Sequence, residues 1–176
     1  MPNSKDRGSV IAGSRSFFKN TFILLFACVL GFVIWYGNQL LLVIKPEGNA
    51  NPIVLRTKAG DRFNLSFTHS VELTIWDEYF RVNGPNDMVM THTEFSSFGW
   101  GFPYLESDGK FSVTKDGRFR LEMNRNYKTV PLRISEQAMQ KIIHGKASYD
   151  LVALYGQGRA VTIFALKRYN YWLNNF

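Results

Sequence analysis

Residues 63–82, FNLSFTHSVELTIWDEYFRV, determine the fold that the sequence predicts. In the first part of this stretch, large apolar residues alternate with polar ones, at Phe63, Leu65 and Phe67. This alternation is typical of a strand buried on one face. The apolar series then resumes with the opposite parity, at Trp76, Phe80 and Val82. The change predicts a turn or bulge within Ser70–Thr74 and an antiparallel partner strand over residues 75–82.

Further strands are expected on both sides of this hairpin. They cover residues 39–44, 53–57, 88–95, 110–114, 118–123, 128–134 and 160–166, separated by Gly, Asn, Asp and Pro. Residues 39–44 could also end a preceding helix, and we favour the strand. Residues 135–144 fit either a helix capped by Ser135 or a loop followed by a strand at 140–143. Turn signals at this spacing predict an all-β domain, either an antiparallel sandwich or a partly open barrel.

Residues 21–36, TFILLFACVLGFVIWY, contain no charged residue, and with their apolar neighbours they reach the roughly 20 residues that a bilayer requires. This predicts a transmembrane signal-anchor helix over residues 21–37, which could extend to residue 44. Four basic residues precede it, and Lys and Arg favour the cytoplasmic side. We therefore expect cytoplasmic residues 1–20, an exported β domain over 38–166 and an aromatic tail over 167–176.

Two alternatives to a retained anchor are a cleaved signal peptide and a lipoprotein. No small-x-small cleavage site follows the apolar run, because Tyr36, Gly37 and Asn38 stand there. Cys28, the single cysteine, is followed by further apolar residues, which argues against lipidation. Ala27 and Gly31 are small enough to let the helix contact another membrane helix closely.

The formal net charge of +7 does not predict nucleic-acid binding. Basic and acidic residues are interspersed through the β domain, and no dense basic run is interleaved with aromatic residues. We therefore expect the lipid bilayer, and no nucleic acid, among the partners.

A histidine, a serine and an acid lie close together at His69, Ser70 and Glu72. A serine hydrolase needs its base within hydrogen-bond reach of the serine, and these groups usually converge from separate parts of a fold. Adjacent side chains in an extended chain point to opposite faces, so His69 is poorly placed to activate Ser70. We therefore expect no enzyme and no cofactor here, and a turn that shapes the fold or meets a partner.

A metal or small-ligand site is the alternative. His92 and Glu94 lie two residues apart on one strand face, and His69, Glu72 and Glu78 could approach from the neighbouring hairpin. The sequence has no His-x-His or paired-cysteine spacing, so we expect no metal and keep this set as the alternative.

Strand parity places Glu78 on the same face as Trp76 and Phe80. A carboxylate there needs a partner that offsets its desolvation, and we expect His69 or an arginine.

A glycine-aromatic loop follows at Gly99, Trp100, Gly101, Phe102, Pro103 and Tyr104. Its glycines permit backbone angles that other residues avoid. The rings could cover the core as a lid or face a partner.

Taken together, residues 67–72, 78–80 and 95–103 resemble a bacterial domain-of-unknown-function family, the one numbered eighteen-fifty. The resemblance covers most of residues 40–166 and implies a single N-terminal membrane segment followed by a β-rich domain. The family's usual loop is closer to Gly-Ala-Gly-Leu-Pro, so Trp100 and Phe102 depart from it. This departure argues against a role that needs a small residue at the loop tip.

Members of that family are often encoded beside fused permeases of TRAP transporters of the TAXI type. The resemblance therefore implies an inner-membrane protein with a periplasmic domain and a fused TRAP permease as partner. We expect a non-enzymatic accessory or assembly subunit that docks through His69 and residues 99–104. The alternative is a periplasmic small-ligand or metal-binding domain.

Overall fold

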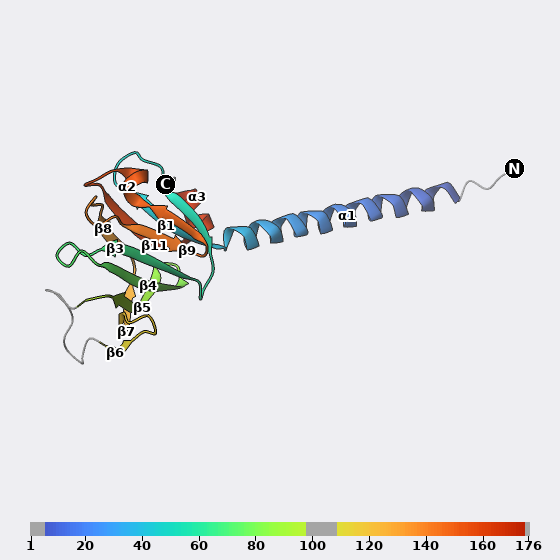
Figure 1. The fold of residues 1–176 in the computed structure, drawn as a ribbon. Coiled ribbons are helices and arrows are strands. Elements are labelled where there is room, and N and C mark those ends of the chain that lie inside the picture. Colours follow the sequence, from blue (N-terminus) through green and yellow to red (C-terminus); the bar gives the residue numbers. More distant parts are fainter. Residues whose placement is uncertain (1–5, 98–108, 175–176) are drawn as a thin grey trace. The chain divides into compact units, whose positions relative to one another are not determined.

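The structure is a computed structural model that describes residues 6–97 and 109–174 (Figure 1). The chain divides after Asn38 into two units, an N-terminal helical unit and a β domain, which are described separately.

The N-terminal unit contains one long helix, α1 (Asp6–Gly37). Its part from Lys19 to Gly37 is long and apolar enough to cross a bilayer, and a helix of this kind near an N-terminus serves as a membrane anchor or as a signal sequence. The helix ends at Gly37, and Leu40–Pro46 form a strand. The helix therefore does not extend to residue 44, and the strand interpretation of residues 39–44 is confirmed.

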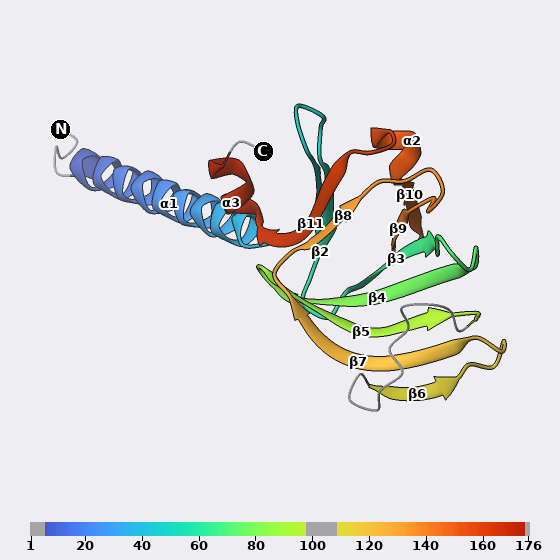
Figure 2. The same cartoon turned by 90° about the vertical axis from the view of Figure 1, so that its left-hand side faces the viewer.

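The β domain consists of two open antiparallel sheets. The four-stranded sheet has the order β2-β1-β11-β8, and the seven-stranded sheet has the order β10-β9-β3-β4-β5-β7-β6. The strands are β1 (Leu40–Pro46), β2 (Ile53–Thr57), β3 (Arg62–Thr68), β4 (Ile75–Gly84), β5 (Asp87–Phe95), β6 (Lys110–Val113), β7 (Phe119–Tyr127), β8 (Val130–Arg133), β9 (Lys141–His144), β10 (Ala147–Asp150) and β11 (Ala160–Lys167). The two short helices are α2 (Leu151–Tyr155) and α3 (Arg168–Leu173). The all-β antiparallel prediction is confirmed, and the sheets close no barrel (Figure 2).

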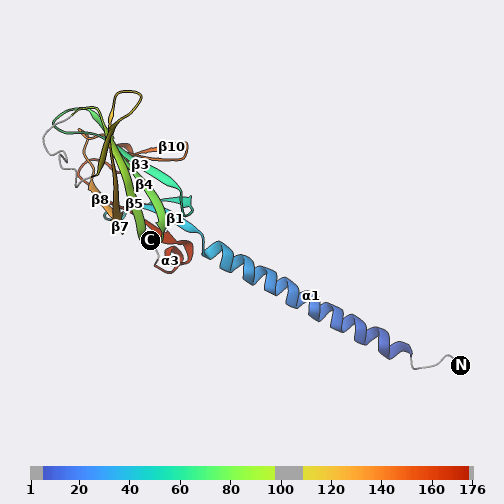
Figure 3. The same cartoon turned by 90° about the horizontal axis from the view of Figure 1, so that it is seen from below.

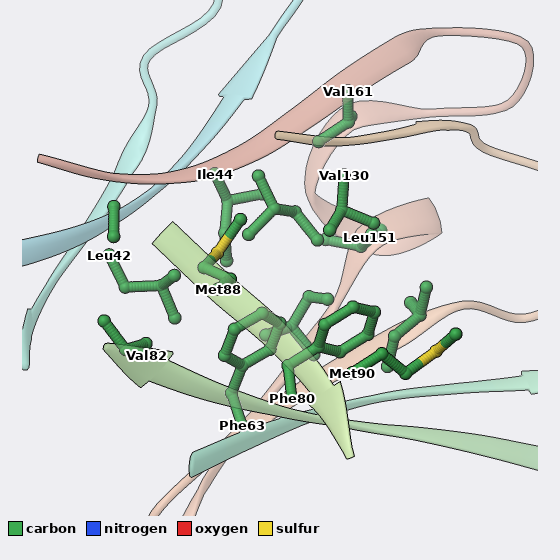
Figure 4. Packing of buried hydrophobic residues seen from close by; sticks show 14 of the residues in the cluster. Leu42, Ile44, Phe63, Phe80, Val82, Met88, Met90, Val130, Leu151 and Val161 are labelled. Carbon is green, nitrogen blue, oxygen red and sulfur yellow. The ribbon is translucent and has the colours of Figure 1, made fainter. Parts of the chain in front are cut away.

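The core lies between the two sheets, where large apolar side chains from β1, β8 and β11 meet those from β3, β4 and β5 (Figure 4). The predicted parity of the central hairpin is confirmed, because Phe63 pairs with Phe80 and their rings stack 5.0 Å apart. Leu65 and Val82 are buried on the same side. Burial of this face fixes the register of β3 against β4, since a slip of one residue would expose every core side chain.

The structure decides one stretch that the sequence left open and adds one element that the sequence did not predict. Residues 136–139 form a turn and β9 follows, so the loop-and-strand alternative for residues 135–144 is correct. The aromatic tail contains a helix, α3, that the sequence did not predict.

Candidate functional site

The turn at residues 69–74 joins β3 to β4 and is held by hydrogen bonds within itself. The His69 N–H donates to the Thr74 carbonyl at 2.9 Å, and the Leu73 N–H donates to the His69 carbonyl at 2.9 Å. The Glu72 N–H also reaches His69 Nδ1 at 3.4 Å. Ser97, beyond the end of β5, donates its hydroxyl to the Glu72 carboxylate at 3.4 Å. The predicted turn is present, and a neighbouring strand end braces it.

The His69 ring continues the apolar face of β3. It stacks on Trp76 with 5.5 Å between ring centroids, and Trp76 in turn stacks on Phe67 and Phe95. Ser70 is exposed instead. The parity argument therefore places His69 correctly, inside a row of aromatic rings.

Three apolar side chains of this turn and of the start of β4 face solvent. Val71, Leu73 and Ile75 are 61%, 72% and 57% exposed. Leu73 also has a positive φ of 53°, a left-handed backbone conformation that costs a residue with a branched side chain about 1–2 kcal/mol. We call these three residues the apolar turn. They form an exposed apolar group on a backbone that is fixed and locally strained.

A polar groove adjoins the apolar turn on the outer face of the seven-stranded sheet. Its volume is about 590 Å³, and its lining includes Thr74, Ile75, Asp77, Ser96 and Arg118. A second groove of about 520 Å³ continues past Tyr79 to His92, Glu94 and Arg120. Ile75 thus belongs both to the apolar turn and to the groove, so the two form one continuous surface.

Two buried carboxylates form the floor of this surface. Asp77 and Glu94 are each 7% exposed, and they lie opposite each other on β4 and β5. Arg118 Nη2 lies 2.7 Å from Asp77 Oδ2, and Arg118 Nη1 lies 3.4 Å from Glu94 Oε2. Arg120 Nε donates to Glu94 Oε1 at 2.8 Å. These ion pairs offset the unfavourable free energy of removing the two charged carboxylates from water.

An aromatic pair extends this cluster along the outer face. The Tyr79 hydroxyl donates to Glu94 Oε2 at 3.2 Å, and the Tyr79 ring stacks on His92 with 4.2 Å between centroids. Burial lowers the pKa of His92, and Arg120 lowers it further. Burial raises the pKa of Tyr79, and the charges of Asp77 and Glu94 add to this effect. His92 is therefore held neutral, stacked in the groove wall.

The expected ion pair of Glu78 is not found in the described part of the chain. Glu78 lies opposite Leu65 and Thr93 on the core-facing side of β4, whereas Arg118 and Arg120 pair with acids on the outer face. Burial raises the pKa of Glu78. The prediction of a His69 or arginine partner is therefore wrong, because successive residues of β4 point to opposite faces and the arginines contact the other one.

The alternative ligand set is not assembled either. His92 and Glu94 do share the outer face, with 3.9 Å between His92 Nε2 and Glu94 Oε1. Glu78 lies on the opposite face, and His69 and Glu72 belong to the turn. Over residues 6–97 and 109–174, no three His, Cys, Asp or Glu side chains are grouped so that they could hold a metal ion.

The glycine-aromatic loop, Gly99 to Tyr104, lies outside the described residues.

Sequence reasoning missed the apolar turn and the partners of Glu94. One sequence feature pointed to the arginine pair: Arg118 and Arg120 lie two residues apart, so their side chains are expected on the same face of a strand. Nothing in the sequence, however, predicts that this pair lies opposite Glu94.

A model of the family described as Domain of unknown function (DUF1850) matches residues 63–151, just over half of the chain. The matched segment begins in β3 and ends at the start of α2, so it contains both the turn and the buried acid–arginine cluster. Neither a curated protein nor a solved structure matches the chain.

Proposed function

The chain belongs to the DUF1850 family, and we propose that it is a non-enzymatic, membrane-anchored accessory or assembly subunit that docks onto a protein partner through the apolar turn. The observation that carries this proposal is the exposure of Val71, Leu73 and Ile75 on a hydrogen-bonded turn. The proposed partner is the fused permease of a TRAP transporter of the TAXI type in the bacterial inner membrane.

The composition of this surface fits a protein partner. Protein interfaces typically have an apolar centre depleted of charge, with polar groups and water around it. Here the apolar turn supplies the apolar part, and the groove beside Ile75 supplies carboxylates and guanidinium groups that are already paired. Because these charges are already paired, the groove can discriminate between protein partners, and docking does not bury an isolated charge. The apolar turn therefore supplies contact area, and the groove supplies specificity.

The connection between α1 and the domain supports a partner in the same membrane. Only Asn38 and Gln39 separate the end of α1 from β1. With α1 as the anchor, so short a connection keeps the domain at the membrane surface, because two extended residues span only about 7 Å. In the proposed topology the N-terminus is cytoplasmic and the β domain is periplasmic.

Co-purification tests the proposal. The tagged full-length protein is isolated from membranes in mild detergent, and the co-eluting proteins are identified by mass spectrometry. We expect the TRAP permease to elute with the unchanged protein and to be lost with Leu73→Ser. Leu154→Ser is the matched control, because Leu154 is an equally apolar side chain, 51% exposed, on α2. Consistent absence of the permease, or its equal retention by Leu73→Ser, would contradict the proposal.

The groove favours a second candidate function, the binding of a small polar ligand. Arg62, Asn64, Tyr79, His92 and Arg120 line its second part, and guanidinium groups recognise carboxylates in a bidentate geometry. This candidate predicts that small dicarboxylic acids raise the melting temperature of the full-length protein and that Arg62→Gln abolishes the rise. Unchanged melting across a panel of such acids would rule it out in favour of the protein partner.

A further inference from the structure

The end of the β domain that receives the chain from α1 also carries helix α3. The Arg168 N–H, at the start of α3, donates to the Gln39 carbonyl at 2.9 Å. The neighbouring residues pair in register, with Leu40 opposite Lys167. Figure 3 shows α3 close to β1. Gln39 follows the last residue of α1 by two positions. Helix α3 therefore begins next to the point where the chain leaves the candidate membrane span.

One side of α3 is attached to the domain. Arg168 is buried, and Tyr171 packs against Leu41, Val43 and Leu166 on the four-stranded sheet. These contacts fix the orientation of the helix on the β domain.

The other side of α3 is exposed and apolar. Tyr169, Trp172 and Leu173 are 40%, 49% and 77% exposed. Residues at i, i+3 and i+4 share one face of a helix, so these three side chains form a single stripe. Tyrosine and tryptophan at such positions are typical of segments that lie at the boundary between lipid headgroups and acyl chains.

Two basic side chains lie at the same end of the domain, one beside the stripe and one beside Gln39. Lys167 Nζ lies 5.9 Å from the centroid of the Tyr169 ring, and Arg56 Nη2 donates to the Gln39 side-chain oxygen at 3.1 Å. Lys and Arg near a membrane surface bind lipid phosphates while their aliphatic stems remain in apolar surroundings. A lysine beside an exposed aromatic stripe, with an arginine at the same end of the domain, matches the headgroup region of a bilayer.

We propose that Tyr169, Trp172 and Leu173 of α3 insert into the outer interface of the membrane that α1 crosses, giving the β domain a second attachment to the bilayer. This rests on the proposed anchoring by α1. Its occupant is lipid rather than protein, because α3 begins at Arg168, which is hydrogen-bonded to Gln39, two residues after the end of the candidate span. Two attachments restrict the rotation of the domain about its two-residue connection and so fix the direction in which it presents the apolar turn.

Fluorescence quenching in proteoliposomes tests the inference. The full-length protein is reconstituted into phosphatidylcholine and phosphatidylglycerol vesicles, with bromine on the acyl chains either near the headgroup or near the chain end. The emission of Trp172 is obtained as the difference between the unchanged protein and Trp172→Phe. We expect shallow bromines to quench this emission strongly and deep bromines to quench it weakly.

Two further tryptophans serve as controls. Trp35, in α1, reports the anchor through Trp35→Phe. Trp76 is the second residue of β4, and the other end of β4 leads to Asn86, whose N–H donates to the Ala165 carbonyl of β11. At about 3.3 Å per residue, Trp76 lies roughly 25 Å along the strand from that end, so its emission should be unquenched by either lipid.

The outcomes separate this inference from the proposed anchoring. If Trp35 is quenched and Trp172 is accessible only to aqueous iodide, the anchor stands and the role of α3 is overturned. If neither tryptophan is quenched, the anchoring fails and the inference fails with it. If Trp172 becomes protected only after a protein partner is added, the stripe is a protein contact and the lipid assignment is wrong.

Discussion

Replacing Leu73 by asparagine should stabilise the domain and abolish docking. Leu73 has a φ of 53°, and the left-handed region costs a leucine about 1–2 kcal/mol, much of which asparagine avoids. The side chain is 72% exposed, so the substitution gives up about a quarter of the roughly 2 kcal/mol of a fully buried leucine. We expect the free energy of unfolding to rise by about 0.5–1 kcal/mol, which is a rise in melting temperature of about 3 °C for a domain of this size.

The assay compares thermal unfolding of the two full-length proteins in detergent by near-ultraviolet circular dichroism, which reports the packing of the aromatic rings in the β domain. Val71→Asn is the matched control, because Val71 is similarly exposed but does not have a positive φ. The control should lose partner capture without gaining stability. A loss of 1 kcal/mol or more in Leu73→Asn would show that the leucine is needed for packing. A gain in stability with unchanged capture would refute the docking role.

Three other changes test the framework beneath the apolar turn. Glu94→Ala should lower the free energy of unfolding by about 3 kcal/mol, measured by urea titration, because it leaves two arginines without a shared carboxylate. Gly109→Ala should prevent pairing of β6 with β7, since its Cβ would lie 1.8 Å from the Glu122 carbonyl oxygen, and protease digestion should then cut the β6 region faster. Burial raises the pKa of Glu78 in the folded state, so this group's contribution to stability is present at acid pH and is lost as pH rises through its folded pKa. Glu78→Gln should therefore be more stable than the unchanged protein above that pH and lose this part of the pH dependence; equal pH profiles would contradict the assignment.

The central hairpin could be predicted because its signals are local. The alternation through Phe63 and Leu65, the change of parity before Trp76 and the turn between them all lie within one short stretch of chain. The same reasoning placed His69 on the apolar face. Each of these features depends only on which side of one strand a residue occupies.

The acid–arginine cluster could not be predicted, because it depends on the register of three strands. The pairing of β4 with β5 shifts between Tyr79 and Phe80, and the pairing of β5 with β7 shifts between Met90 and His92. Met90 faces the core, but the extra residue at Thr91 turns His92 and Glu94 to the outer face. A bulge of this kind reverses parity for the rest of the strand, and this is why Glu94, and not Glu78, meets the arginines.

The position of β11 determines when the β domain can form. This strand lies between β1 and β8, and β1 pairs with it residue by residue from Leu40–Lys167 to Pro46–Val161. The first strand of the β domain thus makes its long pairing with the strand that comes last in the chain, and such a contact between distant parts of the sequence makes folding slow. During synthesis, β1 has only β2 beside it until nearly the whole chain has been made, and its other edge stays open to wrong pairing. A chain that stops before Ala160 would therefore leave the domain unfolded and open to proteolysis.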